Sequence, residues 1–206
     1  MLLRVLAFVS CFFGVLGIVG SPVFAQAENV EQSSLDQAED LLKMKSDTLN
    51  DRVKGVMDDL DQAQMTHFMI IHANYSIFSM VKAVNNDIGA AITGCKDNNS
   101  DLVERLDEKY VAWQEEVGPG MEEVDKNIKS LVLAQDYVPK EELDAIFSLI
   151  DELRETNSSQ FETTPLTTVE ACEFMISKIA ETKDSMNLLL QSTLTSYPNA
   201  VQRNQK

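Results

Sequence analysis

Apolar residues recur along this chain at helical spacing, and no segment shows the sustained alternation of apolar and polar residues that a strand would show. In the first such segment, the apolar positions are seven, four or three residues apart, which places them on one stripe of a helix: Leu35, Leu42, Leu49, Val53, Val56 and Leu60. Ser33 or Ser34 is expected to cap its start. We predict an amphipathic helix that begins near residue 34.

The next segment, residues 65–95, has a different character. Lys82 and Asp87 are its only charged residues, so we predict a central, mostly buried helix. A single helix over residues 34–95 would be about 93 Å long, whereas a compact domain of this size has a radius of gyration of about 16 Å. We expect the chain to turn within residues 55–66, where aspartates can cap helices. An extended coiled coil is the alternative.

Polar residues 96–100 form a linker, after which Asp101 and Glu104 resemble a capping box that opens another helix. Its apolar face continues in phase beyond residues 118–120, the sequence Gly-Pro-Gly, so this triplet is either a kink or a turn. Pro139 is placed to begin a further helix. The last helix is expected to open near Pro165 or within residues 167–170 and to end at Pro198, followed by a frayed tail.

The first 25 residues have the pattern of a cleavable signal peptide. Arg4 provides a positive charge, residues 5–19 are almost entirely apolar, and residues 23–25 (Val-Phe-Ala) place small or modest side chains where a signal peptidase cleaves. We expect cleavage after Ala25 and a mature chain of residues 26–206, a single helical domain that lies in the periplasm or outside the cell. A retained membrane anchor is the alternative, but the apolar run is short for one.

Charge narrows the classes of partner. The chain has 33 acidic and 17 basic residues, and of these only Arg4 precedes residue 26, so residues 26–206 carry a net charge of −17. Such a surface repels nucleic acid and anionic lipid. We therefore expect no nucleic-acid partner. Because the apolar run is expected to be cleaved off with the signal peptide, we also expect no membrane span in the mature chain.

Cys95 and Cys172 are the two cysteines that remain after residue 25. In an oxidising compartment they are expected to form one intramolecular disulfide. Because Cys95 ends one predicted helix and Cys172 lies near the start of another, the bond would make these helices antiparallel neighbours. We predict an all-α fold, an antiparallel up-down bundle of four to six helices with one disulfide.

One helix face carries a candidate ligand set. Met65, Met69 and His72 follow one another at steps of four and three, and thioether and imidazole groups together bind Cu(I) or, from facing helices, haem. Methionines at helical spacing are also ordinary core residues. We therefore predict Met65, Met69 and His72 as candidate metal ligands.

Catalytic motifs are not evident. Both histidines, His67 and His72, lie on one predicted helix, and we find no zinc-protease motif, phosphate-binding glycine loop or serine–histidine–aspartate set. We predict a noncatalytic protein without a cofactor, which acts in the cell envelope or extracellular space by binding another protein or itself. The alternative is a bundle that binds copper, haem or a small apolar ligand at the face of Met65, Met69 and His72.

Overall fold

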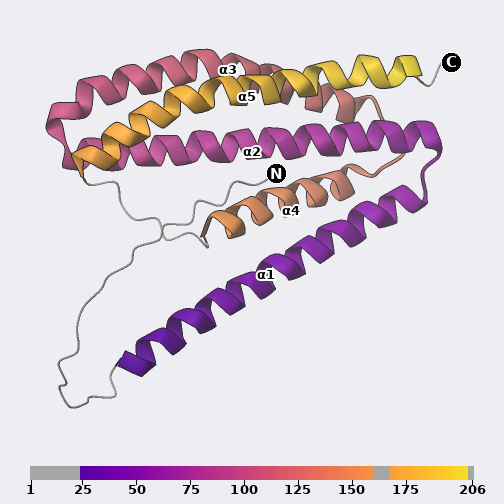
Figure 1. The fold of residues 1–206 in the computed structure, drawn as a ribbon. Helices are drawn as coiled ribbons and strands as arrows, with labels where there is room; N and C mark the ends of the chain where they lie inside the picture. Colours follow the sequence, from indigo (N-terminus) through magenta and orange to yellow (C-terminus); the bar gives the residue numbers. More distant parts are fainter. Residues whose placement is uncertain (1–23, 160–167, 204–206) are drawn as a thin grey trace. The chain divides into compact units, whose positions relative to one another are not determined.

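The computed structural model describes the backbone of residues 24–159 and 168–203 and the side chains of residues 37–157 and 168–195. Within these ranges it has five α-helices, one short 3-10 helix and no strand (Figure 1): α1 (Phe24–Asp58), α2 (Gln62–Asn98), η1 (Ser100–Leu102), α3 (Val103–Leu133), α4 (Lys140–Ser159) and α5 (Val169–Arg203). The predicted all-α class is confirmed. The predicted signal peptide lies outside the described residues, apart from the first two residues of α1.

No helix of the described residues combines enough length and apolar character to cross a membrane. The contacts of the chain separate residues 1–36 from residues 37–206. The bundle described below belongs to the second of these units, to which α1 contributes residues 37–58.

Side-chain contacts show the directions of the helices. The indole N–H of Trp113 on α3 donates to Asn85 of α2 at 3.0 Å, and Lys96 of α2 pairs with Asp107 of α3 at 2.6 Å. Since the residue number rises along one helix as it falls along the other, α2 and α3 are antiparallel. The disulfide between Cys95 and Cys172 relates α2 to α5 in the same way, because Asn74 of α2 donates to the Thr193 carbonyl oxygen near the other end of α5.

The remaining pairs complete an up-down bundle. Lys45 and Arg52 of α1 pair with Glu152 and Glu142 of α4, at 2.5 and 2.8 Å respectively, so α1 and α4 are antiparallel. The helices α2 and α4 are parallel, because Tyr75 stacks on Phe147 and Ser79 donates to Asp151. Every helix therefore reverses the direction of the one before it, and the predicted topology is confirmed.

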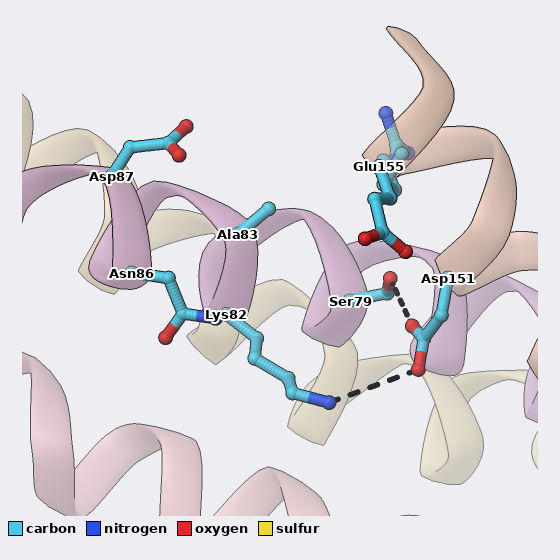
Figure 2. A pocket seen from close by; sticks show the side chains of 8 residues that line it. Ser79, Lys82, Ala83, Asn86, Asp87, Asp151 and Glu155 are labelled. Atoms are coloured by element: carbon cyan, nitrogen blue, oxygen red, sulfur yellow. Dashed lines mark hydrogen bonds and ion pairs between the residues drawn. The ribbon is translucent and has the colours of Figure 1, made fainter. Parts of the chain in front are cut away.

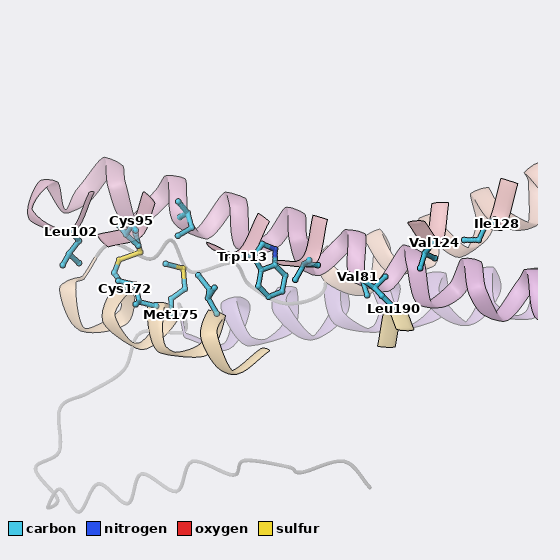
Figure 3. Close-up of a cluster of buried hydrophobic side chains, with 14 residues drawn as sticks. Val81, Cys95, Leu102, Trp113, Val124, Ile128, Cys172, Met175 and Leu190 are labelled. Carbon is cyan, nitrogen blue, oxygen red and sulfur yellow. A yellow bond between two sulfur atoms is a disulfide. The ribbon is translucent and has the colours of Figure 1, made fainter. Parts of the chain in front are cut away.

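The larger of two apolar cores lies between α2, α3 and α5 (Figure 3). Its buried side chains include the disulfide and come from these three helices and from η1: Val81, Ile92, Cys95, Leu102, Leu106, Trp113, Val117, Val124, Ile128, Cys172, Met175, Ile176, Ile179 and Leu190. Gly120 of α3 lies close to α5, where a Cβ would be 3.1 Å from Leu190 Cδ1, so a larger residue would require the Leu190 side chain to shift.

A second core lies on the other side of α2. Its buried side chains come from α2, the segment after α3, and α4: Phe68, Val138, Leu143, Ile146 and Ile150. Partly buried apolar residues of α1 pack against it, but none of residues 37–58 of α1 is fully buried. Thus α2 belongs to both cores, while α1 covers the second one only partially.

The expected turn between the first two helices is present at residues 59–61. Asp61 is the N-cap of α2: its carboxylate accepts hydrogen bonds from the backbone N–H groups of Ala63 and Gln64, and the Gln64 side chain accepts one from the Asp61 backbone N–H. This capping box satisfies donors that the first turn of a helix leaves without partners. Residues 34–95 therefore form parts of two helices, as predicted.

Several predicted helix ends are wrong. Ser33 and Ser34 lie inside α1, which begins at Phe24, because no strong helix breaker separates residues 24–34. Asp101 does not cap α3: it lies in η1, and neither Asn99 nor Leu102, the cap residues of η1 and α3, makes a side-chain cap bond. At the end of α2, the Asn99 side-chain amide donates to the Cys95 carbonyl oxygen and contacts Cys172 Sγ.

Prolines also behave differently from the expectation. The helix α5 continues through Pro198 to Arg203, so neither the predicted end at Pro198 nor the frayed tail from Asn199 is found in the described part of this helix. Pro119 lies within a continuous α3, which decides against a turn at residues 118–120. Proline costs a helix one backbone hydrogen bond, but its fixed φ is compatible with helical geometry. Pro139 precedes α4, as predicted, and its carbonyl oxygen accepts from Glu142 and Leu143.

Candidate functional site

The contact between α2 and α4 is centred on one carboxylate, that of Asp151 (Figure 2). The Tyr75 hydroxyl donates to it at 3.0 Å and the Ser79 hydroxyl at 2.5 Å, while Lys82 Nζ lies 3.7 Å away. The Tyr75 ring stacks on Phe147 of α4, with centroids 3.8 Å apart. A polar cluster therefore joins α4 to α2 beside the apolar core.

Electrostatics keep the Tyr75 hydroxyl protonated. Burial raises the pKa of Tyr75 above its ordinary value, and the hydrogen bond and negative charge of Asp151 raise it further. The phenol is thus a permanent donor to the carboxylate. Because Ser79 is buried as well, these bonds compensate for the desolvation of the polar groups.

The cluster borders a cavity of about 370 Å³ between α2 and α4, lined by Ser79, Lys82, Ala83, Asn86, Asp87, Asp151, Arg154 and Glu155. Ser79 and Lys82 are three residues apart, the spacing of the serine and lysine in some acyl enzymes. Acyl transfer also requires donors aimed at a developing oxyanion, yet the backbone N–H groups around Ser79 bond within the middle of α2. The geometry therefore favours a structural role for this serine. This cluster was not predicted from the sequence, although the three-residue spacing of Ser79 and Lys82 is visible in the sequence.

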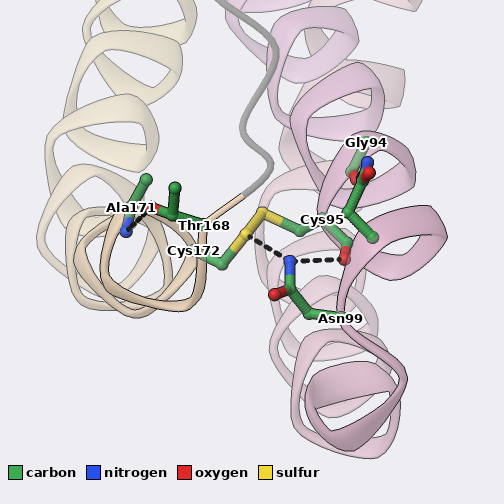
Figure 4. The surroundings of a disulfide bond; sticks show 7 residues. Gly94, Cys95, Asn99, Thr168, Ala171 and Cys172 are labelled. Carbon is green, nitrogen blue, oxygen red and sulfur yellow. Dashed lines mark hydrogen bonds between the residues drawn. A yellow bond between two sulfur atoms is a disulfide. The ribbon is translucent and has the colours of Figure 1, made fainter.

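The predicted ligand face lies on α2. Met69 is 39% exposed, Met65 is half-buried, and His72 is half-buried, with its Nε2 atom covered and without a hydrogen-bond partner. The other histidine, His67, packs edge-on against Tyr137, with ring centroids 5.9 Å apart. In the ranges with described side chains, no group of three or more histidine, cysteine, aspartate or glutamate residues is placed to hold a metal. Cys95 and Cys172, being bonded to each other (Figure 4), are not free thiolate ligands.

Burial lowers the pKa of both His67 and His72 below the ordinary value of 6.5. When the pH falls below 6.5, the unfolded chain takes up protons on these histidines before the folded protein does. Stability conferred by the neutral rings is therefore complete above pH 6.5 and is lost as the pH falls through the lowered pKa values. Between pH 7.5 and 5.2 we expect the urea midpoint to fall.

His72→Gln is expected to reduce that fall, because glutamine does not titrate. The measurement compares urea midpoints at the two pH values for wild type, His72→Gln and His67→Gln. Ion pairs lower the pKa values of Glu152 and Glu173 below 4.5. These carboxylates therefore take up protons below the pH interval of this measurement. An undiminished fall in both variants would contradict the assignment.

Large apolar side chains are exposed on the outer face of α5. Phe174 is 65% exposed and Leu188 is 69% exposed. Lys178 Nζ lies 5.5 Å from the centre of the Phe174 ring and also pairs with Glu181 at 2.5 Å. Phe174 follows Cys172 by two residues, so it stands beside the covalent link between α5 and α2.

Comparisons of the chain with protein-family models, with curated proteins and with solved structures find no match.

Proposed function

We propose that this protein is a noncatalytic helical bundle that works outside the cytoplasm by binding another protein, or a second copy of itself, through the outer face of α5. The observation that carries the proposal is the exposure of Phe174 and Leu188 on that face. The two residues are 14 positions apart, or about 21 Å along a helix. This spacing fits two anchor points within one protein interface.

Phe174 has the properties of an interface anchor. Aromatic side chains supply a large contact area with few rotatable bonds and are enriched among the residues that dominate binding energies. The disulfide at Cys172 holds the start of α5 against α2, so Phe174 is presented by a preorganised backbone. Less ordering of the backbone is then needed on binding, which favours affinity.

Charge indicates the kind of partner. Two ion pairs lie around Phe174, that of Arg105 with Glu173 and that of Lys178 with Glu181. Glu170 is exposed and has no ion-pair partner in the described ranges. Together with the net charge of −17 after residue 25, this favours a partner with a basic rim around an apolar pocket. The apolar segment of residues 5–19 and the disulfide support a location in the periplasm or outside the cell.

The test is photo-crosslinking in the cells that make the protein. A photoreactive phenylalanine analogue at position 174 or 188 is expected to give a discrete adduct, whose mass identifies either a partner or a second copy. The same analogue at Lys126, an exposed position on α3, is the control and should give no adduct. Equal labelling at positions 174, 188 and 126 would contradict a specific interface on α5.

A copper- or haem-binding bundle is the second candidate, and the covered, unpartnered Nε2 of His72 favours it. Stoichiometric copper, or haem absorbance in the Soret region, that disappears in His72→Gln would support this function. A colourless, metal-free protein whose stability does not respond to added copper would exclude it.

A further inference from the structure

A groove of about 470 Å³ lies between α1, α2 and α4. Apolar side chains of α1 and α4 form half of its lining, and polar residues form the other half: Leu42, Ser46, Leu49, Ser76, Ile150, Leu153, Arg154 and Asn157. Its volume is within the range of small-molecule sites in proteins. Ile150 belongs to the second apolar core, whereas Arg154 and Asn157 lie one and two turns farther along α4. The groove therefore has an apolar end and a polar end.

Arg154 is unusual among the cations of this chain. In the ranges with described side chains there are 14 lysines and arginines. All of them except Arg154 have a carboxylate oxygen within 4 Å. Acidic residues outnumber basic ones almost two to one in this chain, and yet this half-buried guanidinium has no carboxylate partner among the described residues. It is therefore available to bind an anionic ligand.

No acidic residue lines the groove, and Arg154 is its only charged side chain. The nearest ion pair of α1 and α4 joins Lys45 to Glu152 and leaves no excess charge there. The distant acidic surface repels an anion only weakly, because charges are screened over about 8 Å at physiological ionic strength. Within the lining of the groove, Arg154 is thus the one charge that faces a ligand, while Asp151 and Glu155 lie with it along the separate cavity between α2 and α4.

The packing of α1 leaves room for a ligand. Its residues 37–58 include no fully buried side chain, although Leu42 and Leu49 face the groove. Burying their exposed apolar surface would stabilise the complex in proportion to the area removed from water. The apolar chain of a ligand would cover Leu42 and Leu49.

We propose that this groove binds a free, single-chain carboxylic acid such as a medium-chain fatty acid. The carboxylate is held by Arg154, whose planar guanidinium forms two parallel hydrogen bonds to such a group. The chain extends toward Ile150 and the second core. The site rests on Arg154 and the lining of the groove and is independent of the outer face of α5.

The experiment measures displacement of a neutral apolar fluorophore, N-phenyl-1-naphthylamine, from the purified protein at pH 7.5. Decanoate is expected to displace it at least tenfold more effectively than methyl decanoate, which has the same chain without the charge. From the eight-carbon to the ten-carbon acid, affinity should rise about fourfold per methylene. Arg154→Gln should remove the advantage of the acid and leave the ester unchanged.

Two variants locate the ligand. Ser46→Phe, which fills the groove from α1, should abolish binding of both compounds. Lys82→Gln is the matched control: it removes a cation from the polar cavity between α2 and α4, which Arg154 also borders, and should change neither affinity. Because Arg154 has no ion pair to lose, Arg154→Gln should keep the wild-type urea midpoint, which separates lost binding from lost folding.

The proposal is overturned if decanoate and its ester bind equally to the wild type, if neither displaces the fluorophore, or if Arg154→Gln retains the advantage of the acid. Equal losses in Lys82→Gln and Arg154→Gln would place the carboxylate in the cavity between α2 and α4 and exclude the groove. Binding that survives in Ser46→Phe excludes the groove as well. Sedimentation with phosphatidylglycerol vesicles that depends on Arg154 would identify a membrane lipid instead of a free acid.

Discussion

Replacing Cys95 and Cys172 together by alanine is expected to lower the free energy of unfolding by about 2–5 kcal/mol. The bond joins residues 77 positions apart, and the chain-entropy estimate for a loop of this length is about 4.5 kcal/mol, which strain in the native state reduces. Because both sulfurs are buried in the core of α2, α3 and α5, the loss should appear as a lower urea midpoint for these helices.

The measurement is urea unfolding of the double variant, the oxidised wild type and the wild type under a reducing agent. Reduced wild type and double variant should unfold at similar midpoints, both below that of the oxidised protein. If the double variant kept the oxidised midpoint, the disulfide would contribute nothing to stability. Single substitutions are less informative, because each leaves a thiol able to join two chains.

Trp113→Ala is expected to destabilise the protein by about 3–5 kcal/mol. Trp113 is fully buried between α2, α3 and α5, so its removal leaves a large cavity. Its indole N–H also donates to Asn85 Oδ1, which accepts a second bond from Gln114 at 2.7 Å. Two losses therefore combine, that of apolar packing and that of a hydrogen bond between helices.

Circular dichroism during urea unfolding measures this effect, since the substitution removes the only tryptophan. Trp113→Phe should cost less, because it keeps most of the apolar volume and loses the hydrogen bond and only a small part of the packing. Val111→Ala, on the same helix but more than half exposed, is the control and should change stability by less than about 0.5 kcal/mol. An equal cost for Trp113→Ala and Val111→Ala would contradict the assignment of Trp113 to the core.

The sequence was most informative where one-dimensional pattern and burial coincide. The fall in charge density near residue 65 predicted two helices in different surroundings, and the capping box of Asp61 separates them. The positions of Cys95 and Cys172 within their predicted helices were enough to predict antiparallel neighbours, and the disulfide confirms them. Both inferences depend on local spacing, which the sequence records directly.

Helix ends were predicted less well, because capping residues compete with the tendency of neighbouring residues to continue a helix. Ser33 and Ser34 are acceptable caps in isolation, but the residues before them are also helical. At Pro198 the expected break is absent: α5 continues to Arg203, although proline removes one backbone hydrogen bond and its ring crowds the carbonyl group one turn earlier. Propensity alone does not decide such cases.

The candidate sites lay mostly beyond the reach of sequence reasoning. Asp151 becomes the acceptor for Tyr75 and Ser79 only through the parallel alignment of α2 with α4, more than 70 residues apart in the chain. In the sequence, Arg154 does not stand out, because many other basic residues also have acidic neighbours along the chain. Its lack of an ion pair is a property of the assembled groove.

The alternation of helix directions has a consequence for biogenesis. The chain leaves α3, forms α4 on the opposite side of α2, and only then returns to place α5 beside α2 and α3. Cys172 is therefore available to Cys95 only after the chain has been synthesised through the start of α5. Before that point Cys95 cannot form this bond, and a bond to another thiol would prevent it. The disulfide can therefore form only after α1, α2, α3 and α4 have been synthesised.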